Sequence, residues 1–306
     1  MNHRSQQSRI LGLSLGLLAL LAAPNLGAAT PDWLLDPSPF KAQVRVSADG
    51  RDVALENGLV RRVIRIAPNA ATIAYDNLMT GESMIRSVRP EAQVEIDGTA
   101  YDVGGLTGQP VHNYLDAAWV DTLEAQPGAF RFTRFTTGQT KERFPWKKRL
   151  EWMPQDSLWP APGVSLTLEF VAPNSSAVAI DVHYELFDGI PLLSKWIVVR
   201  NASDQPVRLN RFISEILAAV EPESIVDDSP TWQLPHLMVE TDYTFGGMSG
   251  PNHSAGVFWV PDPLYSSQVN YSRLTPCLLE CRPPLGPDQV IAPGSSFESF
   301  RAFELA

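Results

Sequence analysis

Apolar and polar residues alternate with a period of two along much of this chain, which is the pattern of half-buried β-strands. Over residues 178–186 one strand face is apolar and the other carries most of the polar groups. The apolar face consists of Val178, Ile180, Val182, Tyr184 and Leu186, and the other face of Ala179, Asp181, His183 and Glu185. The same alternation returns in residues 166–170 and 94–96. These runs predict antiparallel strands with one face on a core.

The segments between the runs carry turn residues. Asn57-Gly58 and Asp97-Gly98 stand between strand-like runs, and such dipeptides supply the positive φ angles of tight hairpins. The 26 prolines and 20 glycines are spread throughout and divide the chain too finely for long helices. Arg211–Val220 would suit a helical face or a strand, and we favour the strand. A last strand is expected over Ser296–Leu305, so the sequence predicts an all-β domain.

The first 29 residues have the form of a secretory signal peptide. Arg4 and Arg9 precede an apolar run over residues 10–23, and Ala28-Ala29 offers small residues for cleavage. The run is shorter than the roughly 20 apolar residues that a membrane span requires, so no membrane span is expected. We therefore expect a signal peptide over residues 1–29, one β-domain over residues 30–306, and a secreted or periplasmic mature chain.

Charge and cysteine usage narrow the function classes. Loss of Arg4 and Arg9 with the leader changes the formal net charge from −10 to −12, and an acidic chain of this kind repels nucleic acid. Cys277 and Cys281 are the two cysteines, and in an extended segment they cannot close a disulfide, so we expect buried free thiols. The sequence has no phosphate loop, dinucleotide fingerprint, nucleophile elbow or zinc-type histidine pair, so no cofactor and no metal are expected.

Three tryptophans gather in a proline-rich stretch that forms the first candidate binding site. Trp146, Trp152 and Trp159 could supply flat surfaces for the C–H faces of sugar rings, and Asp156 could accept hydrogen bonds from sugar hydroxyls. The alternative interpretation is that these rings cover the core beneath a long loop, because aromatic side chains dominate ordinary packing as well.

Glu240–Met248 is the second candidate. Its paired glycines allow close approach of a backbone, and Asp242 beside Tyr243 and Phe245 could hold a polyol. The alternative is a β-turn with a solvated aspartate, which the sequence alone favours.

Five carboxylates lie close together in the sequence: Glu215, Glu221, Glu223, Asp227 and Asp228. A glycosidase needs two carboxyl groups that face one glycosidic bond. Proximity along the chain does not establish that geometry, so a solvated acidic edge is the favoured interpretation and no catalytic residue is assigned.

Three segments carry a resemblance to a known family. They are LENGLVRR at residues 55–62, YELFDGIPLLSKW at residues 184–196 and FESFRAFEL at residues 297–305. They resemble the N-terminal β-supersandwich domain of family-36-type glycoside hydrolases, the α-galactosidase-like enzymes, over most of residues 40–305. The resemblance implies a large antiparallel β-supersandwich of the galactose mutarotase type that acts outside the cytoplasm on glycosides. The catalytic carboxylates of such enzymes lie on a following barrel without a counterpart here, so none is carried over.

The function expected from this resemblance is that of a non-catalytic carbohydrate-associated module. Such a module would bind sugar, or dock on a catalytic barrel in a separate domain or chain. The alternative is a stand-alone mutarotase-like enzyme or glycosidase, in which Glu215 or Glu240 acts near His183 or His236. A third interpretation is a purely structural extracellular domain.

Overall fold

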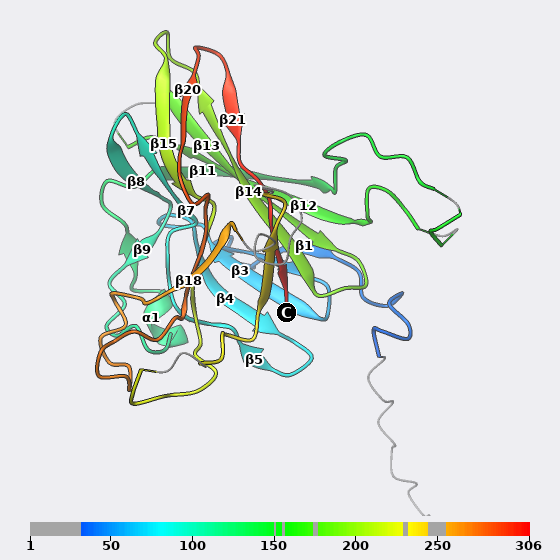
Figure 1. Ribbon diagram of the computed structural model, residues 1–306, viewed down its shortest axis with the longest axis horizontal. Helices are drawn as coiled ribbons and strands as arrows, with labels where there is room; N and C mark the ends of the chain where they lie inside the picture. Colours follow the sequence, from blue (N-terminus) through cyan, green and yellow to red (C-terminus); the bar gives the residue numbers. More distant parts are fainter. Residues whose placement is uncertain (1–31, 150, 155–156, 174–176, 229–231, 244–254) are drawn as a thin grey trace, which may run out of the picture. The chain divides into compact units, whose positions relative to one another are not determined.

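Antiparallel strands make up nearly all the regular structure of the computed structural model, and the all-β prediction is confirmed (Figure 1). The structure describes residues 32–149, 151–154, 157–173, 177–228, 232–243 and 255–306. The predicted signal peptide and the candidate residues Asp156 and Phe245 lie outside the described residues. The helix α1 is a single turn, Ala117–Val120. No helix among the described residues is both long and apolar enough to cross a membrane.

Two sheets contain most of the strands. A five-stranded sheet follows the chain in the order β1 Gln43–Val46, β2 Asp52–Glu56, β3 Val60–Arg65, β4 Ala71–Asn77 and β5 Glu82–Ser83. A seven-stranded sheet has the order β11 Arg131–Gln139, β12 Gly163–Val171, β13 Val178–Phe187, β14 Leu192–Asn201, β22 Ala302–Leu305 and β17 Met238–Thr241, with β21 Ser296–Glu298 also paired to β14. Figure 1 shows β12, β13 and β14 side by side along their length.

Smaller sheets complete the domain. One contains β20 Pro287–Ile291, β15 Val207–Ile213, β7 Ala92–Ile96 and β8 Thr99–Val103. Another contains β18 Val257–Val260, β19 Leu278–Cys281, β16 Glu215–Ala219 and β6 Ile85–Ser87. A two-stranded ribbon pairs β10 Glu124–Ala125 with β9 Leu106–Thr107.

The predicted turns and strands are found at their expected places. Gly58 has a φ of 86° in the turn between β2 and β3, and Asp97 and Gly98 have φ angles of 48° and 77° between β7 and β8. Arg211–Val220 is extended in β15 and β16, as favoured from the sequence. Cys277 and Cys281 are buried free thiols, as expected.

The expected strand Ser296–Leu305 is interrupted, which corrects the sequence-based prediction. Both of its halves, β21 and β22, pair with β14, but three residues stand opposite two of β14 between them. The extra residue forms a bulge. The Ser299 hydroxyl occupies the gap, because it accepts the N–H of Ile197 at 3.0 Å and donates to the Phe300 carbonyl at 2.8 Å.

All four larger sheets contribute to one apolar core. The alternating face of β13 is buried as predicted, with Ile180, Val182, Tyr184 and Leu186 fully excluded from solvent. The same core includes residues of the other sheets, such as Ile64, Leu209 and Leu279. The period-two pattern therefore directs each sheet's apolar face to a common interior.

A group of charged side chains lies inside this core, and we call it the buried ion network: Arg62, Glu91, Lys195, Glu215 and Glu304, each at most 1% exposed. Arg62 donates to both oxygens of Glu215 at 2.7 and 3.2 Å. Lys195 donates to Glu215 at 2.9 Å and to the carbonyl oxygen of Glu91 at 2.6 Å. The prediction that Glu215 belongs to a solvated acidic edge is therefore wrong.

The reason is that Glu215 begins β16, where its side chain meets two cations from earlier strands, Arg62 of β3 and Lys195 of β14. Glu223, Asp227 and Asp228 are exposed and remain consistent with an acidic surface. Glu221 differs from them, because its carboxylate accepts the Tyr265 hydroxyl at 2.8 Å. The five acidic residues thus divide between core and surface although they are close in sequence.

Two glycines allow a direct test of close packing. Gly104 and Gly98 both have a positive φ, 68° and 77°. A Cβ on Gly104 would lie 2.3 Å from the Ala70 carbonyl oxygen, whereas a Cβ on Gly98 would meet nothing within 4 Å. We expect Gly98→Ala to cost about 1 kcal/mol through its backbone conformation, and Gly104→Ala about 2–3 kcal/mol because a clash is added. Urea midpoints of the two variants measure the difference, and equal midpoints would contradict it.

Candidate functional site

The loop between β11 and β12, residues 140–162, carries the predicted tryptophans, and we call it the aromatic loop. It is drawn in green in Figure 1 and contains no strand among its described residues. Its ends are closed by a hydrogen bond from the Thr140 hydroxyl to the Ala161 carbonyl at 2.6 Å. Lys148 Nζ bridges the loop to the Ser157 carbonyl at 3.1 Å. The loop therefore has its own internal contacts.

Three aromatic rings meet on this loop. The ring centroid of Trp159 lies 5.3 Å from that of Trp146 and 6.0 Å from that of Phe144. Phe144 is 55% exposed and Trp159 44% exposed, and Trp146 is half-buried. The described core cluster contains none of these rings. The structure therefore brings Trp146 and Trp159 together on the surface.

Trp152 lies apart from this cluster. Its ring is 75% exposed, and the guanidinium carbon of Arg149 lies 5.5 Å from its centroid. A guanidinium over a solvated indole forms a cation–π contact of modest strength. The ring leaves most of its flat surface open to solvent.

Asp242, from the second predicted site, is joined to the root of the aromatic loop. Its carboxylate forms an ion pair with Arg143, the residue before Phe144. It also accepts the backbone N–H of Arg301 at 2.7 Å. The neighbouring Tyr243 packs on Phe300 with centroids 5.3 Å apart and belongs to the edge of the core. The two candidate stretches, separate in sequence, are thus neighbours in space, although Tyr243 is used in packing.

A row of side chains crosses the outer face of the seven-stranded sheet beside this region. The His183 ring stacks on the Trp196 ring, with centroids 4.9 Å apart. Trp196 also forms a cation–π contact with Arg301, whose guanidinium carbon lies 3.9 Å from the ring centroid. His183 Nδ1 is 3.0 Å from the Thr167 hydroxyl. Burial first, and then the charge of Arg301, lower the pKa of His183 to about 4. His183 is therefore neutral at physiological pH.

Glu185 connects this row to the aromatic loop. Its carboxylate accepts the Lys141 N–H at 2.9 Å and pairs with Arg301 at 3.0 Å. Burial raises the pKa of Glu185, although both contacts oppose the shift. The root of the aromatic loop is thus held to the sheet at Glu185 and at Asp242.

The suggested pairing of Glu215 with His183 is wrong. Glu215 contacts Lys195 on the core side of β14, whereas His183 stacks on Trp196, the next residue, which points to the opposite side. Glu215 is fully buried, so no substrate reaches it. No group of three or more His, Cys, Asp or Glu side chains in the described part of the chain is arranged to hold a metal ion.

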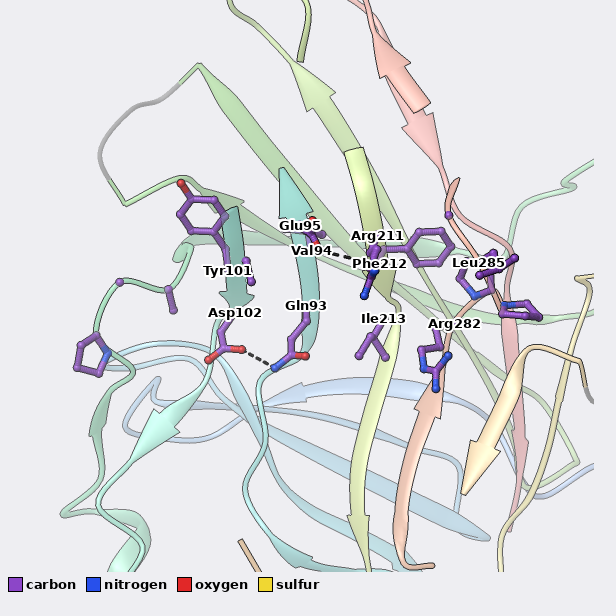
Figure 2. A pocket seen from close by; sticks show the side chains of 17 residues that line it. Gln93, Val94, Glu95, Tyr101, Asp102, Arg211, Phe212, Ile213, Arg282 and Leu285 are labelled. Atoms are coloured by element: carbon purple, nitrogen blue, oxygen red, sulfur yellow. Dashed lines mark hydrogen bonds and ion pairs between the residues drawn. The ribbon is translucent and has the colours of Figure 1, made fainter. Parts of the chain in front are cut away.

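A groove of about 770 Å³ lies over β7, β8 and β15 (Figure 2). The Gln93 amide donates to Asp102 at 2.8 Å, and Arg211 lies 3.7 Å from Glu95. The loops 127–129 and 283–286 border the groove. These two pairs join polar groups of neighbouring strands across the groove, as Figure 2 shows.

The sequence matches no protein-family model and no curated protein. Solved α-galactosidases are similar to it in structure. The enzyme from Lactobacillus brevis is similar over 85% of this chain and 40% of its own, with 14% sequence identity and a TM-score of 0.46. A family-36 α-galactosidase from Geobacillus stearothermophilus is similar over 86% of this chain and 40% of its own, with 9% identity and a TM-score of 0.47.

The galactosidase domain of an α-galactosidase–sucrose kinase gives similar values: 86% of this chain, 41% of that chain, 8% identity and a TM-score of 0.47. The chain therefore spans about 40% of the length of these solved structures.

The groove and the outer row of the sheet are features that the sequence did not reveal. Alternation in β7 places Val94 and Ile96 inward and so indicates that Gln93 and Glu95 face outward. It does not indicate which loops border them. The aromatic loop could be predicted because tryptophan is a rare residue and three of them lie close together in this part of the sequence. The sequence offered no comparable signal for the stack of His183 on Trp196, since the pair depends on the register of β13 and β14.

Proposed function

We propose that this chain is a carbohydrate-associated module of the glycoside-hydrolase type, which binds sugar rings on the aromatic loop. The observation that carries the proposal is the cluster of Phe144, Trp146 and Trp159 on the surface, outside the core. Large exposed aromatic surfaces are costly in water and mark interaction sites.

The loop suits a sugar better than a purely apolar ligand, because polar side chains lie beside its aromatic rings. The pyranose C–H face stacks on an indole, while the ring hydroxyls require charged or amide groups nearby. Arg143 and Asp242 stand at the root of the loop next to Phe144 and supply such groups. We further propose that the module works outside the cytoplasm and that a catalytic barrel, in a separate domain or chain, is its partner. The three segments that resemble family-36-type enzymes support this part.

Calorimetric titration of the purified protein with galactose-containing oligosaccharides tests the proposal. We expect Trp159→Ala to weaken binding by roughly tenfold or more, because one stacking platform is lost and its two neighbours lose their contact. Trp159 is chosen because it contacts both other rings.

Tyr271→Ala is the matched control. Tyr271 is 84% exposed on a different loop, so its removal deletes a comparable exposed ring without touching the cluster. Flat titrations of the unmodified protein with every oligosaccharide tried, or equal affinities for Trp159→Ala and the control, would disprove sugar binding at this loop.

A further inference from the structure

Two arginines share one carboxylate beneath a second cavity of the domain. Arg86 and Arg89 both donate to Asp262, which is fully buried. The side chain of Arg86 is 2% exposed and that of Arg89 10% exposed. Two arginines and one aspartate carry a net charge of +1, so one of the two arginines has no carboxylate of its own.

The remaining donors of the two arginines differ. Arg86 donates through Nε and Nη1 to the carbonyl oxygens of Ala219 and His112, and the Nη2 that binds Asp262 also donates to the Cys277 sulfur. Arg89 binds Asp262 through Nη2 alone, and its buried Nε has no hydrogen-bond partner among the described residues. Burial, opposed by Asp262, leaves the pKa of Arg89 below its ordinary value. A buried guanidinium donor without an acceptor is costly, so a bound acceptor would stabilise it.

Arg89 lines a cavity of about 590 Å³. This volume lies in the usual range for small-molecule sites. Polar lining comes from Gln109, Gln126 and His112, and apolar lining includes Leu106 and Leu264. Burial first, and then the charge of Arg89, lower the pKa of His112, so its ring is neutral. Besides Arg89 and Asp262, the charged groups of the lining are the carboxylates of Asp102 and Glu280.

The other carboxylates near the cavity already have partners. Glu280 pairs with Arg282 at 2.8 Å, and Glu221 accepts the Tyr265 hydroxyl. Asp102 accepts the Gln93 amide at 2.8 Å at the edge that the cavity shares with the groove of Figure 2. Asp102 retains acceptor capacity there, because an ionised carboxylate has about four lone-pair sites.

We propose that this cavity binds a small hydroxy acid, with its carboxylate on Arg89 and its hydroxyls on Gln126 and Asp102. A hexuronate has this chemistry and fits the volume. Arg89 offers one cation, and the Asp102 and Glu280 carboxylates in the lining disfavour an anion of higher charge, such as phosphate. The cavity shares no residue with the aromatic loop, so this inference stands or falls independently of sugar binding there.

Titration with sodium galacturonate and with galactose tests the proposal, because the two sugars differ at C6, a carboxylate in one and a CH₂OH group in the other. We expect galacturonate to bind the unmodified protein at least tenfold more tightly than galactose does in this cavity. Arg89→Met is expected to remove that preference, while Trp159→Ala leaves it unchanged. Arg211→Met is the matched control, since it removes an arginine that pairs with Glu95 at 3.7 Å, and neither of these residues lines this cavity.

A second variant keeps the test decisive if Arg89→Met does not fold. Gln126→Trp would fill the cavity without altering an ion pair, and it is also expected to abolish galacturonate binding. The proposal is overturned if galacturonate binds no better than galactose, if either variant binds galacturonate as well as the unmodified protein does, or if sodium sulfate binds as tightly as galacturonate.

Discussion

Replacement of Lys195 by methionine is expected to lower the free energy of unfolding by about 3–5 kcal/mol, the usual cost of breaking a buried ion pair by removing one partner. Lys195 is fully buried and donates to Glu215 and to the Glu91 carbonyl. Its ammonium also lies 3.3 Å from the Glu91 carboxylate. Methionine fills a similar volume, so the expected loss comes from the uncompensated carboxylates and not from a cavity.

The shift of the urea midpoint measures this effect. Lys41→Met is the control, because Lys41 also pairs with a carboxylate, Asp188 at 3.1 Å, but its side chain is 65% exposed. An exposed pair of this kind contributes about 1 kcal/mol or less. If both variants unfold at similar urea concentrations, the buried ion network is not a determinant of stability.

The second large effect concerns Glu304, the least supported carboxylate of the buried ion network. The network contains two cations and three carboxyl groups. Glu215 accepts from both Arg62 and Lys195, whereas Glu304 accepts from one cation among the described residues, Arg62 at 3.3 Å. The Glu215 carboxyl and the Tyr75 hydroxyl also lie against Glu304. Burial, and then the charge of Glu215, raise the pKa of Glu304 well above its ordinary value. One proton on Glu304 makes the network neutral.

This proton gives the protein a pH dependence of definite sign. Above the unfolded pKa of about 4.5, the folded state holds a proton that the unfolded state has lost, so stability falls as pH rises, by about 1.4 kcal/mol per pH unit, until the folded pKa is reached. Glu215 and Glu91 act in the opposite sense, because Arg62 and Lys195 outweigh the burial that would raise their pKa values. Their contribution is lost as pH falls below about 4.5.

Glu304→Gln isolates the first contribution, since glutamine resembles the protonated acid in shape and cannot ionise. We expect this variant to match the unmodified protein near pH 4.5 and to become progressively more stable than it as the pH is raised toward 7. Unfolding free energies at several pH values test the expectation. Parallel curves for the two proteins would show that Glu304 is ionised in the folded state.

The fold was predictable where a local pattern determines it. The period-two run in residues 178–186 and the Asp97-Gly98 turn describe β13 and the β7–β8 hairpin correctly. The bulge between β21 and β22 was not predictable, because it depends on the Ser299 hydroxyl meeting Ile197, about a hundred positions away. The residues around Ser299 give no indication that Ile197 is its partner.

The candidate sites divide in the same way. The cluster of tryptophans in the sequence indicated an aromatic surface, and Trp146 and Trp159 are in contact in the structure. The location of Glu215 was missed because its two cations come from β3 and β14. The sequence alone does not distinguish a carboxylate that cations from distant strands neutralise from one that is exposed to solvent.

The segments that carry the family resemblance meet in the interior. Arg62, Lys195 and Glu304 belong one to each of them and are joined through the buried ion network. Asn57 of the first segment also binds the carbonyl oxygens of Phe187 and Ile190 in the second, at 2.9 and 2.8 Å. The residues that carry the resemblance therefore hold the sheets together. Their role is in the fold and does not identify a substrate.

The contact between Arg62 and Glu304 joins positions 242 residues apart. During synthesis, Arg62 on β3 can therefore meet Glu304 only after residue 304 has emerged from the ribosome. Contacts of such long range slow folding. An unfinished chain therefore holds part of its charged interior without partners until β22 pairs with β14.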